Sequence, residues 1–353
     1  MALTQERRAA LLAAKLAALV ATRTAPGAPA GASGAPASRL PGPFPGGATL
    51  VVADADGAPG RSQGWVLAED QAERALGPAL AWAASRGLEA DALHVVADHH
   101  AGLLARRAAT FAEPPHVWRV EGAELAPADA APVTAPVDAP AAALELVDLL
   151  EDEGVDVVVD HGEVIGEVRG LEVARVVVGE SGVAHLEVGV GRNDREAFAV
   201  MHADQDPRDA LRSVVATVSA QRRAGTAPHP LNRLGASRWL RAQLVADPAR
   251  VGAAHLRAVP GVLPRGGVKE SVPVAAVGAD AEGRPLVVVT SIGIDLDLVP
   301  AAADLRLAHA PGARLVLALP ERDAHPVTRR LASALVEPAE VVALPGDWRE
   351  EER

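Results

Sequence analysis

The chain has 353 residues, close to half of them apolar, with 46 acidic and 34 basic side chains and a formal net charge of −12. Its length allows two or three folded domains, and its charge argues against polyanion binding by the whole surface, although a local basic face is still allowed. Cysteine is absent, which excludes a disulfide framework and thiolate catalysis.

An amphipathic helix is predicted over residues 1–23. Leu12, Leu16 and Leu19 recur at helical spacing, and Lys15 interrupts the apolar run. This interruption favours a helix that docks on a protein partner over a signal peptide. No apolar run reaches the length of a bilayer span, so we expect a cytoplasmic protein without a membrane partner.

Two stretches rich in proline and alanine, 24–47 and 126–141, are typical of linkers. Between them, residues 48–125 alternate short apolar strands with helical patterns, which indicates parallel strands with right-handed crossovers. Residues 251–353 repeat this alternation. Both units contain an Arg pair, an apolar turn, Glu-Pro and a strand, at 105–120 and 328–344. An ancient duplication explains this likeness, and so does the shared composition of two βαβ units.

Residues 142–250 follow another plan. A short helix precedes three strand-like runs, 155–168, 171–178 and 183–190, and helices follow from about 207 to 222 and near 231–245. The predicted fold class is therefore α/β, with two flanking βαβαβ-type parallel-sheet units around a central α+β module.

Acidic residues alternate with β-branched residues along the central strands, and His185 and Glu187 share a face. In element order this module resembles the PD-(D/E)xK nuclease core, a family in which acids on two strands bind Mg²⁺ and a lysine assists the water or the phosphate. The resemblance implies that Glu172 and Glu187 are catalytic and hold the metal, and that Asp160 assists. Gly189 stands where that family has its lysine.

Arg192 and Arg195 follow the last of these strands and are the expected phosphate ligands of the nuclease-like site. The alternative interpretation is a solvated sheet face, on which Glu172 and Glu187 pair with arginines across the strands.

A second candidate surface lies in the basic tract 221–241. Arg238 and Arg241 fall on one helix face, where they suit phosphates, and Trp239 suits base stacking. The alternative is an Arg-rich solvated helix with Trp239 in the core. Lys269, one of only two lysines, follows two glycines and could belong to an anion-binding turn or to an ordinary one.

Other motifs are incomplete. The segment 189–198 lacks the third glycine of a phosphate loop, so no nucleotide cofactor motif is present. Asp295, Asp297 and Val299 resemble the haloacid-dehalogenase phosphatase signature, and Asp54 and Asp56 form a partial copy. Aspartates at strand ends also serve simply as turns. The bias toward Ala and Arg resembles that of proteins from bacteria with GC-rich genomes.

The sequence therefore predicts a nucleic-acid-directed protein with a Mg²⁺-dependent nuclease-like centre, intact or degenerate. A non-catalytic interaction or scaffold protein is the alternative, followed by a phosphate-ester hydrolase using Asp295 and Asp297.

Overall fold

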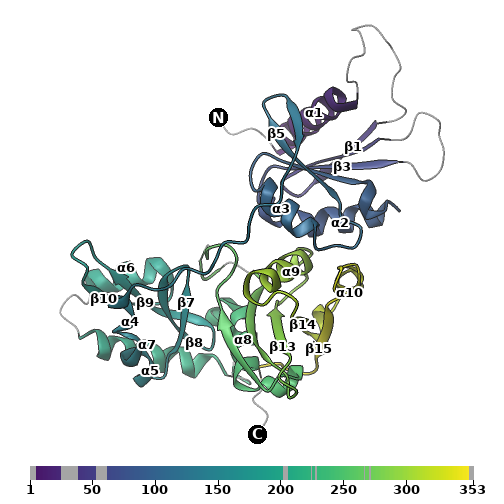
Figure 1. The fold of residues 1–353 in the computed structure, drawn as a ribbon. Coiled ribbons are helices and arrows are strands. Elements are labelled where there is room, and N and C mark those ends of the chain that lie inside the picture. The colour runs from purple at the N-terminus through teal and green to yellow at the C-terminus, as the bar shows by residue number, and fades with distance from the viewer. Residues whose placement is uncertain are drawn as a thin grey trace. The chain divides into compact units, whose positions relative to one another are not determined.

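Figure 1 shows the fold of the computed structural model. It describes residues 5–24, 39–52, 62–201, 206–223, 225–226, 229–265, 267–269 and 272–349. Unit 1 comprises residues 1–132, 299–304 and 330–338, and unit 2 comprises the rest. Helices and sheets alternate in both, so the expected α/β class is confirmed. Within the described ranges, no helix is long and apolar enough to cross a membrane.

Unit 1 is built on a six-stranded sheet whose strands lie side by side in chain order. They are β1 (Arg39–Phe44), β2 (Gly47–Val52), β3 (Gln63–Ala68), β4 (Leu93–Ala97), β5 (His116–Glu121) and β6 (Glu124–Pro127). Only β3, β4 and β5 are parallel, and α2 (Leu76–Ser85) and α3 (Ala101–Ala108) connect them. The sheet is therefore mixed, with the predicted crossovers at its centre.

Strand β1 falls inside the segment that was expected to be a linker. It contains Pro41 and Pro43 and forms the edge of the sheet. Proline has no N–H to donate, and a sheet edge is where a missing donor is tolerated. The ordered sheet therefore begins earlier than composition indicates.

The predicted N-terminal helix is present as α1 (Gln5–Thr24). Its residues Leu16, Leu19 and Val20 are buried and pack with Leu50 and Trp65 of the six-stranded sheet. Helix α1 lies on one face of this sheet, and α2 and α3 lie on the other (Figure 1). The apolar face expected to dock on a partner is covered within unit 1 and is not free.

Unit 2 contains a five-stranded sheet with the strand order and directions of β1–β5. Its strands are β11 (His255–Val259), β12 (Val274–Ala279), β13 (Pro285–Thr290), β14 (Arg314–Pro320) and β15 (Glu340–Leu344). Helix α8 (Ala236–Ala246) precedes β11, while α9 (Leu298–His309) and α10 (Pro326–Ser333) lie between the parallel strands in the sequence. The suspected repeat thus extends to the topology of both sheets.

The central module, also in unit 2, is a four-stranded antiparallel sheet with α4 (Ala141–Leu144), α5 (Val147–Asp152), α6 (Gly191–Met201) and α7 (Pro207–Gln221). Its strands are β7 (Asp156–Asp160), β8 (Glu163–Val168), β9 (Leu171–Val178) and β10 (Ala184–Val188). The first predicted strand-like run is in fact a hairpin, which turns at His161 and Gly162 with positive φ at both.

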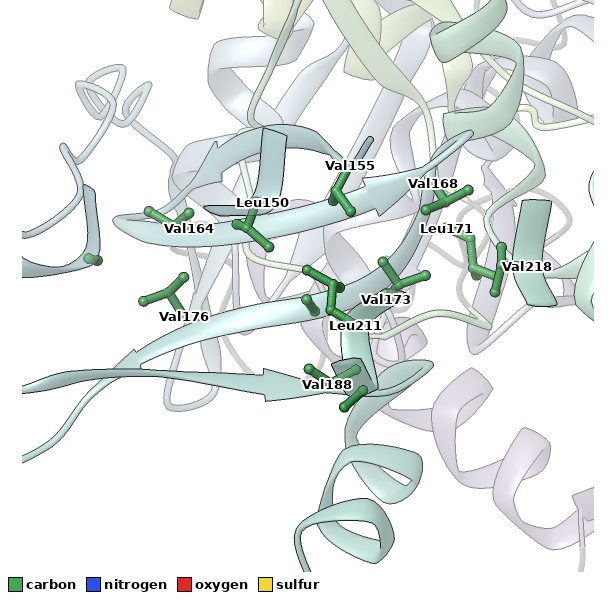
Figure 2. Packing of buried hydrophobic residues seen from close by; sticks show 13 residues of the cluster. Leu150, Val155, Val164, Val168, Leu171, Val173, Val176, Val188, Leu211 and Val218 are labelled. Atoms are coloured by element: carbon green, nitrogen blue, oxygen red, sulfur yellow. The ribbon is translucent and has the colours of Figure 1, made fainter. Parts of the chain in front are cut away.

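One face of this sheet is apolar. Val164, Val176 and Val188, from three adjacent strands, point into one cluster that Leu211 and Val218 of α7 complete (Figure 2). Burying such branched side chains stabilises the sheet by about 1.5–3 kcal/mol each. Because side chains alternate along a strand, the polar residues between them must lie on the opposite face.

Candidate functional site

The second face of the four-stranded sheet carries a row of acids. Cross-strand pairing places Asp156 opposite Glu167 and Glu167 opposite Glu172, so the three lie across three neighbouring strands. Glu167 was not among the predicted residues, because the hairpin that brings it onto this face was not recognised. The signal was present: His161-Gly162 lies between two alternating apolar segments, as in a two-residue hairpin turn.

Glu172 and Glu187 come together, but an arginine lies with them. Arg195 of α6 binds Oε1 of Glu172 through Nη1 and approaches Oε2 of Glu187 through Nε at 3.4 Å. Arg175 adds a second guanidinium to Glu172, at 3.1 Å from Oε1. Arg195 is therefore buried between the two acids and is not an exposed phosphate ligand.

The two acids differ in their access to solvent. The Glu172 side chain is 5% exposed, whereas the Glu187 side chain is 38% exposed. No group of three or more His, Cys, Asp or Glu side chains that could hold a metal ion occurs among the residues that the structure describes. A cation held by Glu172 and Glu187 would have to compete with Arg195 for the same oxygens.

Gly189 stands where the nuclease family has its lysine, and no side chain fits at this position. Its φ is 144°, and a Cβ atom there would lie 2.8 Å from the backbone nitrogen of Arg195. The start of α6 therefore lies too close to β10 for any residue larger than glycine. Close approach of two backbone segments, rather than chemistry, fixes this residue.

Asp160 belongs to a different ion cluster, centred on Glu167. Arg265 binds both Asp160 and Glu167, the latter at 2.7 Å. Arg241 donates to Oε2 of Glu167 at 2.7 Å, and Arg238 lies 3.9 Å from Oε1. Burial by itself raises the pKa of Glu167, but the three arginines outweigh it and lower the pKa to about 2.

The basic tract is consequently turned inward. Arg238 and Arg241 are each 3% exposed, and Trp239 is fully buried. The guanidinium of Arg222 lies 4.3 Å from the centre of the Trp239 ring, on which a base was expected to stack. The prediction that Arg238, Arg241 and Trp239 form an exposed nucleic-acid-binding surface is therefore wrong, because Glu167 holds the two arginines in the interior. Arg192 is exposed and pairs with Glu196 at 2.7 Å.

The same tract contributes its other side to a pocket of about 280 Å³. Its lining comes from the turn before α8, the first residue of α8, the segment 267–269, the residues after β13 and the C-terminal segment. The lining residues are Asn232, Arg233, Gly235, Ala236, Lys269, Ile292 and Arg349. We call this the basic pocket. It lies beside the carboxyl end of a parallel strand, where α/β sheets bind their ligands.

The cations of the basic pocket are poorly compensated. Among the described residues, neither Arg233 nor Lys269 has an acidic partner, and Arg349 has only Asp347, at 3.4 Å. Helix α8 begins at this pocket, and no side chain caps its N-terminus, which is the positive end of the helix dipole. Positive charge thus gathers at this pocket.

Arg222 fixes the shape of the turn that carries Arg233. It is fully buried and donates to the carbonyl oxygens of Leu231 and Leu234, at 2.8 and 2.9 Å. Burial and neighbouring arginines lower its pKa to about 9, so it stays charged at neutral pH. The turn is therefore anchored to the interior of unit 2 while its side chains line the pocket.

The paired aspartates do not join this pocket. Asp295 Oδ1 accepts a hydrogen bond from the backbone nitrogen of Asp297 at 3.0 Å, and Asp297 is buried directly before α9. This arrangement is typical of a turn that starts a helix. Asp54 and Asp56 lie outside the described residues.

Comparison of the chain with protein-family models, curated proteins and solved structures finds no match.

Proposed function

We propose that the protein binds nucleic acid and that the basic pocket of unit 2 holds one phosphate of the polymer. The observation that carries this proposal is the pair of uncompensated cations, Arg233 and Lys269, on one pocket with Arg349 and the start of α8. A phosphate supplies the missing negative charge and accepts hydrogen bonds from guanidinium, ammonium and backbone N–H groups alike.

A phosphate within a polymer can reach the basic pocket, because Arg233 and Lys269 are both exposed. Arg349 also lines a second pocket of about 390 Å³, but Glu321 and Asp347 balance the two arginines there, so the proposal is confined to the basic pocket. The same proposal includes a cytoplasmic location, because nucleic acid is present in that compartment.

The proposal is tested by fluorescence anisotropy with a labelled 20-nucleotide single strand at several salt concentrations. Replacing Arg233 and Lys269 together by Gln should weaken binding about tenfold or more and reduce the salt slope by about 1–2, because up to two phosphate contacts are lost. Arg212→Gln is the matched control, since Arg212 is exposed and already paired with Glu153. Equal affinity of the double variant and the wild type would overturn the proposal.

A Mg²⁺-dependent nuclease centred on Glu172 and Glu187 is the second candidate. It is favoured by the approach of both carboxylates to a single cation, Arg195. Cleavage of labelled DNA or RNA should then require Mg²⁺ or Mn²⁺ and disappear in Glu187→Ala. The control is Glu163→Ala, an exposed acid of the neighbouring strand that pairs with Arg175. Binding without metal-dependent cleavage would leave a non-catalytic nucleic-acid binder.

A further inference from the structure

The two segments that carry the uncompensated cations of the basic pocket are joined by a backbone hydrogen bond. The N–H of Gly235 donates to the carbonyl oxygen of Val268 at 3.1 Å. Arg233 lies two residues before the donor and Lys269 directly follows the acceptor, and both side chains line the pocket and are exposed. Because Arg222 also anchors the turn of Arg233, the fold itself places the two cations on one pocket that solvent reaches.

The charges around this pocket do not balance. Arg349 is offset by Asp347 at 3.4 Å, which leaves the positive charges of Arg233 and Lys269. Arg222 adds a buried guanidinium that, within the described ranges, donates only to carbonyl oxygens. Burial lowers its pKa most, and repulsion from other arginines, Arg349 among them, lowers it further. The pocket therefore has two exposed positive charges to offset, and a third is buried near Arg349.

The phosphates of a nucleic acid differ in charge according to their position. An internal phosphodiester carries one negative charge. A phosphate at the end of a strand is a monoester, which carries about 1.5 to 2 negative charges at neutral pH because its second pKa is about 6. The monoester also has three terminal oxygens, one for each of Arg233, Lys269 and Arg349, whereas the diester has two.

We infer that the basic pocket prefers the terminal phosphate of a nucleic-acid strand to an internal one, an inference that rests on the proposed nucleic-acid binding. The size of the pocket agrees with this preference. Its volume of about 280 Å³ lies just below that of small-molecule sites, which span about 300–1,000 Å³. Such a pocket suits one phosphate with part of its sugar. A terminal phosphate needs room for the strand on one side only, whereas an internal one needs room on both.

The inference is tested with four single strands of one sequence in anisotropy titrations at neutral pH and one salt concentration, each labelled at an internal base. They carry a phosphate at the 5′ end, a phosphate at the 3′ end, hydroxyl groups at both ends, or methylated phosphates at both ends. One of the two phosphorylated strands should bind about tenfold more tightly than the hydroxyl strand, since charge-assisted contacts are gained. The methylated strand keeps both phosphates with one charge each and should show little of this gain.

The preference should depend on pH and on the two cations. It should shrink when the pH is lowered to about 5, because the terminal phosphate then binds its second proton. Replacing Arg233 and Lys269 together by Gln should bring the affinities for the phosphorylated and hydroxyl strands close together. Arg212→Gln, the exposed and paired control, should keep them apart.

Equal affinity of the wild type for the phosphorylated and methylated strands would overturn the inference even if the double variant fails to fold. A preference that survives in the folded double variant would contradict it as well. Displacement of the strand by a nucleoside monophosphate at matching concentration would assign the pocket to a small phosphate compound instead. If no strand binds in a salt-dependent way, the proposed function fails, whereas salt-dependent binding without a preference for phosphorylated ends refutes only the inference about the terminal phosphate.

Discussion

The sheets β1–β5 and β11–β15 share strand order and directions, yet their carboxyl edges differ in charge balance. In unit 1, Lys15 of α1 binds Glu69 and Asp98, which follow β3 and β4, at 2.9 and 2.6 Å. Near the corresponding edge in unit 2, Arg233 and Lys269 have no such partners among the described residues. One topology therefore carries a neutralised edge in unit 1 and an edge with uncompensated cations in unit 2.

The largest expected effect concerns the buried ion cluster around Glu167 in unit 2. Glu167→Gln removes the counter-charge of Arg241 and Arg265 in the interior. Losing one member of a buried pair should destabilise unit 2 by about 3–5 kcal/mol, as measured by urea unfolding followed by tryptophan fluorescence. Glu163→Gln, on the same face but with an exposed carboxylate, should cost under about 1 kcal/mol. Similar losses for both variants would contradict the cluster's role.

Arg222→Met tests whether the pocket depends on its buried anchor. The carbonyl oxygens of Leu231 and Leu234 lose their donor, so we expect a loss of about 2–4 kcal/mol in unfolding free energy and weaker nucleic-acid binding. Arg223→Met is the control, because among the described residues the exposed Arg223 side chain donates only to the carbonyl of Ser219. If folded Arg222→Met binds nucleic acid as tightly as the wild type, the pocket does not depend on Arg222 for binding.

The two units should also respond to acid in different pH windows. Burial, His116 and Arg23 lower the pKa of His94 in unit 1 from 6.5 to about 4, so the folded state binds that proton less readily than the unfolded state. Unit 1 should therefore lose this stability as the pH falls from about 6.5 to about 4.

In unit 2, Glu167 loses its stabilising contribution over a lower pH range than His94 does in unit 1. Its carboxylate contributes stability above its ordinary pKa of 4.5, and this contribution is lost as the pH falls toward about 2. Urea unfolding at a series of pH values checks both windows. In His94→Gln the loss between pH 6.5 and 4 should shrink while the loss below 4.5 persists, and the reverse result would refute the assignment.

The smallest expected effect on stability comes from variants at the carboxyl edges of the two sheets. Lys15→Met removes partly exposed ion pairs and should cost about 1 kcal/mol of stability without changing nucleic-acid affinity. Arg233→Gln combined with Lys269→Gln should do the opposite, with less than about 0.5 kcal/mol of stability change and a clear loss of affinity. Thermal unfolding and anisotropy on the same samples decide the matter. Lower affinity in Lys15→Met would assign the binding edge to unit 1.

Much of the fold could be read from local patterns. The N-terminal helix and the parallel strands follow from periodicity that neighbours along the chain supply. Pro-rich β1 and the turn at His161-Gly162 were missed, since both depend on which strand the segment pairs with.

The sequence by itself determined the α/β class, the acidic alternation on the central strands and the basic character of residues 221–241. Only the tertiary structure decided which charges neutralise one another. Arg195 lies with Glu172 and Glu187, and Glu167 draws Arg238 and Arg241 inward. Arg233 and Lys269 are left without acidic partners in the described structure because no carboxylate is brought to them. Charge pairing depends on distances between residues remote in sequence, and residue type alone does not specify them.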